Sequence, residues 1–152
     1  MRRAEKYYHP GHWTGAAVAT LTLPYADRHR RRILLKDDSG EPFLLDLPHA
    51  TRLDHGGGLE VEPGRFIKVC AAIEDVTDIC CQSAVHTAQV AWHIGNRHAP
   101  LQVLEDGRLR IVSDHVLGQM LEGLGAHLQA ARAPFAPEGG AYKNGHQYEH
   151  SH

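Results

Sequence analysis

Histidines are the residues of this chain whose type and placement could support chemistry, and that chemistry would be metal coordination. The chain has 13 histidines beside 16 lysines plus arginines. A neutral imidazole nitrogen binds nickel, copper or zinc, and imidazole alone does not select among these ions. The candidate ligands are a loop histidine, a histidine at a predicted helix start, and three histidines near residue 152, namely His98, His115, His146, His150 and His152.

His98 lies in the stretch Trp92–Gln102, which is predicted to close a helix, turn and open a strand. Pro100 cannot continue a helix, and Gly95 is predicted to end it, because glycine adopts the left-handed conformation at low cost. A lone histidine in such a loop is most often a hydrogen-bonding residue, and a metal ligand is the alternative. Because Arg97 would repel a cation, a metal site here would be exposed and exchangeable.

The last residues of the chain offer a second supply of imidazoles. Short histidine-rich tracts are typical of metal binding, while a cloning tag is the other interpretation, although tags are usually unbroken runs. Residues 135–152 combine proline, glycine and histidine without an apolar face, and they are predicted to form a flexible tail. Tethering raises the effective concentration of such ligands, so the tail histidines could complete a site at His98.

His115 follows Asp114 at the start of a predicted helix. If Val116 and Leu117 point into the core, the imidazole points outward. This pattern favours a solvated or structural role over an accessory metal site.

Residues 1–72 are predicted to form a small all-β domain, because short apolar runs alternate with turn residues and no helical period occurs. The first 14 residues are predicted to be an irregular lead-in. Turn chemistry at Asp38–Glu41 joins two of the runs into a hairpin. The predicted strands cover residues 16–23, 33–35, 42–47, 59–62 and 66–70.

Residues 73–134 are predicted to form a ferredoxin-like βαββαβ domain, which makes the whole chain an α+β protein of two domains with a tail. Ser83 is the predicted N-cap of the first helix, Ser113-Asp114 is predicted to cap the second, and Asp106-Gly107 indicates a hairpin. Apolar spacing predicts which residues of each helix face the core. They are Val85, Ala88 and Trp92 in the first helix, and Val116, Leu117, Met120, Leu121 and Leu124 in the second.

Composition excludes several classes of protein. The formal net charge of −2 gives no field that would attract nucleic acid or a membrane surface. Three cysteines without a paired spacing are typical of a reducing compartment, and neither a signal peptide nor a membrane span is visible, so the cytoplasm is expected. No nucleophile with a base and no catalytic carboxylate pair occurs at a recognisable spacing, which predicts a protein that is not an enzyme.

The run His93–His98, followed by Pro100-Leu101-Gln102, resembles the signature of the UreE family, the urease accessory nickel metallochaperones. The resemblance continues through Asp114–Leu117 and Ala133–Tyr142, and it extends more loosely over the N-terminal half as a β-rich, peptide-binding-like domain. The chain departs from the family pattern at Ile94, where leucine is usual, and in a short tail with three histidines.

The resemblance implies a homodimer that meets through its C-terminal domains. In that scheme His98 of both subunits is the central nickel ligand, the tail histidines His146, His150 and His152 add ligands, and His115 is secondary. It also implies delivery of Ni(II) to the urease apoprotein within a complex that includes an accessory GTPase, with zinc or copper as ions that could bind in vitro. The alternative is a metal-independent module that binds protein or RNA, since a ferredoxin-like fold hosts many functions.

Overall fold

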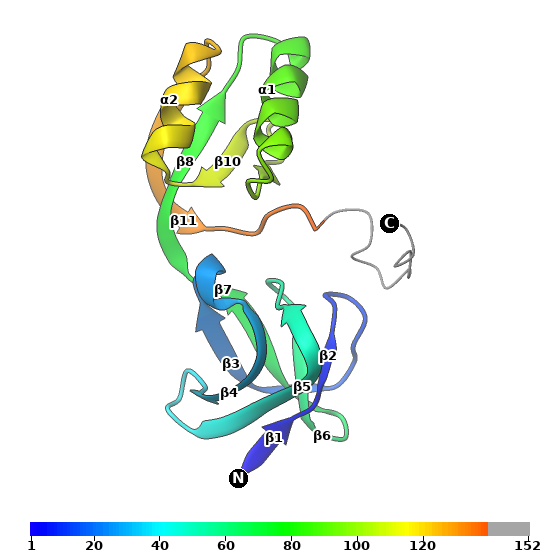
Figure 1. The fold of residues 1–152 in the computed structure, drawn as a ribbon. Helices are drawn as coiled ribbons and strands as arrows, with labels where there is room; N and C mark the ends of the chain where they lie inside the picture. Colours follow the sequence, from blue (N-terminus) through cyan, green and yellow to red (C-terminus); the bar gives the residue numbers. More distant parts are fainter. Residues whose placement is uncertain (140–152) are drawn as a thin grey trace. The chain divides into compact units, whose positions relative to one another are not determined.

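The structure is a computed structural model that describes residues 1–139. The chain forms two compact units, Met1–Ala72 and Ile73–His152. Figure 1 shows the strands and helices of both units, coloured along the sequence. No helix within residues 1–139 is long and apolar enough to cross a membrane.

The first unit is an all-β sandwich of two sheets, as predicted. One sheet has the order β1-β5-β4 and the other the order β2-β6-β7-β3. A single 3-10 turn, η1 (Tyr25–Asp27), interrupts the strands. The strands are β1 (Arg2–Ala4), β2 (Lys6–Tyr8), β3 (Ala16–Leu23), β4 (His29–Lys36), β5 (Pro42–Arg52), β6 (Gly58–Glu62) and β7 (Arg65–Ala71).

Both sheets contribute to the core of this unit, because alternate residues of each strand point inward. Phe43 and Leu45 of β5 and Ile67 and Val69 of β7 are fully buried. The prediction of an irregular lead-in over residues 1–14 is wrong. β1 pairs in parallel with β5 and β2 pairs with β6, so both early strands depend on partners far along the chain.

The second unit confirms the predicted ferredoxin-like fold. Its elements are β8 (Ile73–Cys80), α1 (Ala84–Asn96), β9 (Gln102–Val103), β10 (Leu109–Val112), α2 (His115–Gly123) and β11 (His127–Pro134). The four strands form one antiparallel sheet in the order β11-β8-β10-β9. Side chains of both helices and of the sheet share one core, and Figure 1 shows the helices side by side.

Predicted caps begin both helices. The Ser83 hydroxyl accepts a hydrogen bond from the backbone N–H of His86 at 3.1 Å. The Asp114 carboxylate accepts from the N–H of Leu117 at 2.9 Å. Each side chain therefore satisfies a donor that the first helical turn leaves without an intrahelical acceptor.

The core-facing side of α1 differs from the prediction. Val90 and Ile94 are buried, whereas Val85 and Trp92 are 67% and 62% exposed. In α2, Leu117 and Leu121 are buried as predicted, but Val116 is 67% exposed. α1 therefore has two rows of apolar residues. The row with Val90 and Ile94 packs into the core, and the row with Val85 and Trp92 is exposed.

Candidate metal site

His98 has a backbone conformation that glycine usually occupies. Its φ is 58°, and it is the one non-glycine residue with positive φ among residues 1–139. The His98 N–H donates to the Gly95 carbonyl at 2.9 Å, and the Ala99 N–H donates to the Ile94 carbonyl at 3.3 Å. These two bonds form the Schellman motif, in which the left-handed residue lies just beyond the helix end.

The second helix ends in the same motif with glycine at the matching position. Gly125 has φ 86°, and its N–H donates to the Glu122 carbonyl at 3.0 Å. The Ala126 N–H donates to the Leu121 carbonyl at 3.1 Å. A side chain in the left-handed region costs roughly 1 kcal/mol relative to glycine. The end of α1 therefore has a histidine where the end of α2 has the less strained residue.

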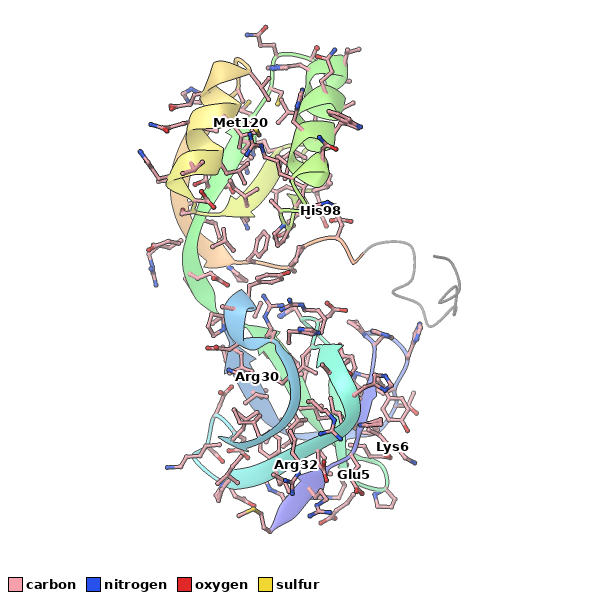
Figure 2. All side chains as sticks on the ribbon, in the orientation of Figure 1. Glu5, Lys6, Arg30, Arg32, His98 and Met120 are labelled. Carbon is pink, nitrogen blue, oxygen red and sulfur yellow. The ribbon has the colours of Figure 1, made fainter. Side chains whose placement is uncertain are left out.

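The imidazole of His98 is free to bind a ligand. The residue is exposed, and its ring makes no hydrogen bond, ion pair or ring contact with residues 1–139. Figure 2 shows it at the lower end of α1 in that view. The helix dipole places partial negative charge at this end, which partly offsets the repulsion that the neighbouring exposed Arg97 exerts on a cation.

The described part of the chain gives His98 no nearby set of ligands. Among residues 1–139, no group of three or more histidine, cysteine, aspartate or glutamate side chains could hold a metal ion together. His115 is the first residue of α2 and is exposed on the border of a groove shared with Gln119 and Glu122. The remaining predicted ligands, His146, His150 and His152, lie outside the described residues.

The segment predicted to begin the flexible tail is packed against the second unit at its first residues. Phe135 is fully buried. The Ala136 N–H donates to the Gln102 Oε1 at 2.9 Å, and the Glu138 N–H donates to the Leu101 carbonyl at 2.7 Å. Ordered packing therefore extends past Pro134, where the domain was predicted to end, through a strap formed by residues 135–138.

Sequence reasoning missed the exposed apolar face of α1, formed by Val85, Ala88 and Trp92, because it assigned these residues to the core. They recur at helical spacing and all three are exposed. Large exposed apolar side chains gathered on one face mark surfaces that bind other molecules. Val90 and Ile94 form a second apolar pair, four residues apart, and this spacing could have identified the buried face of α1.

Comparison with known protein families matches both units. The model described as the C-terminal domain of the UreE urease accessory protein matches residues 74–152, and the corresponding N-terminal model matches residues 2–72. The chain belongs to the UreE family. The C-terminal UreE match includes His98 and the strap, and the resemblance seen in the sequence is thereby confirmed.

Individual UreE relatives align over nearly the whole chain. A protein named urease accessory protein UreE from Chelativorans sp. (strain BNC1) is 48% identical over 136 residues, which cover 90% of this chain and 85% of the relative. One of the same name from Rhodopseudomonas palustris (strain HaA2) is 44% identical over 147 residues, or 97% of this chain and 68% of the relative. The UreE of Beijerinckia indica is 41% identical over 152 residues, covering 100% and 87%.

Proposed function

We propose that this protein is a nickel metallochaperone that carries Ni(II) to the urease apoprotein while the urease metal centre is assembled. It acts by binding and release and not by catalysis. The observation that supports this proposal most is the conformation of His98, an unpartnered exposed imidazole in a glycine-type position of a UreE chain. A strained residue that the fold does not require is a sign of functional constraint.

The bridging site consists of His98 from each of two subunits. Within the described residues no group of three or more candidate ligands surrounds His98, and a twofold axis beside it would supply a second identical imidazole. The exposed apolar face of α1 supplies the contact between the C-terminal domains of the homodimer. Two imidazoles and solvent hold an ion less tightly than a closed four-ligand cage, which suits a protein that must release its ion.

The histidines of the tail, His146, His150 and His152, add ligands to the ion held by His98, and His115 is a secondary site. Zinc and copper are ions that the same imidazoles could bind in vitro. The partners are the urease apoprotein and an accessory GTPase complex. Cys70, Cys80 and Cys81 are all free thiols, which supports action in the reducing cytoplasm.

A calorimetric nickel titration combined with sedimentation tests this function. We expect a dimer with one tight nickel ion per two chains, because each chain contributes one His98. The absence of nickel binding would contradict the proposal, and so would a monomer that binds nickel as tightly as the dimer. The first of these results would favour the metal-independent interaction module.

Nickel affinity is expected to fall steeply in mild acid. Free imidazole titrates near pH ~6.5, and the protonated ring has no lone pair for the metal. Because two imidazoles bind one ion, the affinity should fall up to about 100-fold per pH unit below that value. Nickel titrations between pH 7.5 and 5.5 would measure the slope, and a constant affinity over this range would exclude imidazole ligands.

A further inference from the structure

We propose that Glu138 is a positioning residue that anchors the root of the histidine-bearing tail to the strand next to His98. This inference rests on the proposed nickel function and specifies how the tail histidines are kept near the bridging site. It gives a role to the Pro134–Gly139 part of the sequence, which the metal site itself does not use.

Glu138 binds the strand through both its backbone and its side chain. Its N–H donates to the Leu101 carbonyl at 2.7 Å. Its carboxylate oxygen Oε2 accepts from the N–H of Val103 at 3.1 Å. Two bonds from one residue, one to Leu101 just before β9 and one to Val103 within it, fix both its position and its direction.

The strap uses an edge that the sheet leaves unpaired. β9 is the last strand of the order β11-β8-β10-β9, so only one of its sides pairs with β10. In an extended strand, the carbonyl of residue 101 and the N–H of residue 103 point to the same side. Glu138 satisfies both groups on the open side and thereby covers an edge that could otherwise pair with another chain.

Two further contacts hold the strap in register. Phe135 is fully buried, which fixes the chain where it leaves β11. The Gln102 side chain accepts a hydrogen bond from the Ala136 N–H at 2.9 Å. The path from Phe135 to Glu138 is therefore fixed at three successive points, and Glu138 is the last of them.

Chain length shows why this anchor point matters. His98 lies three residues before Leu101, so their Cα atoms are at most about 11 Å apart. His146 lies eight residues after Glu138, a distance that the chain can span with up to about 28 Å when extended. The first tail histidine can therefore reach the His98 region from an anchor at Glu138.

Loss of the anchor would lengthen the tether. Phe135 and Ala136 keep their own contacts, so the last fixed point moves back to Ala136, and His146 is then 10 residues away instead of eight. The effective concentration of a tethered ligand falls roughly as the −3/2 power of tether length, which gives about a 1.4-fold loss for the nearest tail ligand. With two ligands engaged, the loss of nickel affinity would reach about twofold.

The experiment compares nickel affinity, measured by calorimetry, in full-length Glu138→Ala, Glu138→Gln and Glu105→Ala. We expect Glu138→Ala to bind about twofold more weakly. Glu138→Gln, which retains an acceptor oxygen, should bind like the wild type. Glu105 is exposed in the loop after β9 and takes no part in the strap, so Glu105→Ala controls for the loss of one negative charge.

A second background separates the anchor from local damage. When His146, His150 and His152 are all replaced by alanine in the full-length chain, Glu138→Ala should have no effect on nickel affinity, because the anchor acts only through them. The proposed anchor would be overturned if Glu138→Ala lowered nickel affinity equally in this background, or if it had no effect on nickel affinity in the wild-type background. Failure of wild-type protein to bind nickel, or wild-type affinity in His98→Ala, would instead overturn the proposed function.

Discussion

Replacing His98 with glycine is expected to abolish the tight bridging nickel ion and to make the second unit more stable. The proposed dimer would lose both of its central ligands, so nickel affinity at this site should fall about 100-fold or more, since the loss of supporting groups alone costs 10–100-fold. Glycine removes the strain of φ 58° at this position, which should raise the free energy of unfolding by about 1 kcal/mol. Nickel calorimetry and urea unfolding measure the two effects.

His98→Ala is the matched control. It removes the same imidazole but keeps a Cβ in the left-handed conformation, so nickel binding should be lost without a gain in stability, and the dimer should persist. Glycine would thus be the more stable of the two variants, although glycine is the more flexible residue in the unfolded chain. Tight nickel binding by either variant, or greater stability of the alanine variant, would refute the account of His98.

Replacing Trp92 with glutamate is expected to dissociate the proposed homodimer. Tryptophan is among the residues whose truncation costs most at interfaces, about 2–4 kcal/mol, which corresponds to a dimer dissociation constant raised about 30- to 1000-fold. The fold should tolerate the change, since Trp92 is 62% exposed within its own unit. Sedimentation over a concentration series measures the constant, and circular dichroism checks the fold.

Leu34→Glu provides the control for Trp92→Glu. Leu34 is 58% exposed on β4 of the first unit, so the two changes introduce the same charge at similar exposure. Only the change on α1 should separate the subunits, and nickel affinity should fall with it because a monomer has one His98. A dimer that survives Trp92→Glu would place the subunit contact elsewhere.

Local sequence patterns predicted those parts of the fold that depend on neighbouring residues. The turns at Asp38–Glu41 and Asp106-Gly107 and the caps Ser83 and Asp114 involve residues close in the chain, and the structure confirms all of them. β1 could not be predicted in this way, because Arg2–Ala4 becomes a strand only through pairing with Phe43–Leu45.

The candidate site was predicted by residue type, whereas its backbone conformation was not. Gly95 is the conventional residue for ending a helix, yet the helix continues through Asn96 and His98 takes the left-handed position. An apolar contact across the turn frequently accompanies the Schellman motif. If the helix ended at Gly95, this contact would pair the polar Asn96 with Ala91. With His98 in the left-handed position, the contact pairs Ala99 with Ile94, and both belong to the same core.

The parallel pairings of the first unit have a consequence for synthesis on the ribosome. Within residues 1–139, β3 pairs only with β7. Ala16 of β3 therefore cannot pair until Arg65 of β7 has been synthesised. Distant pairings of this kind form slowly, and unpaired strands are prone to association with other nascent chains. Slow translation or a holding factor acting on the first 65 residues should therefore affect the yield of folded protein more than the same delay later in the chain.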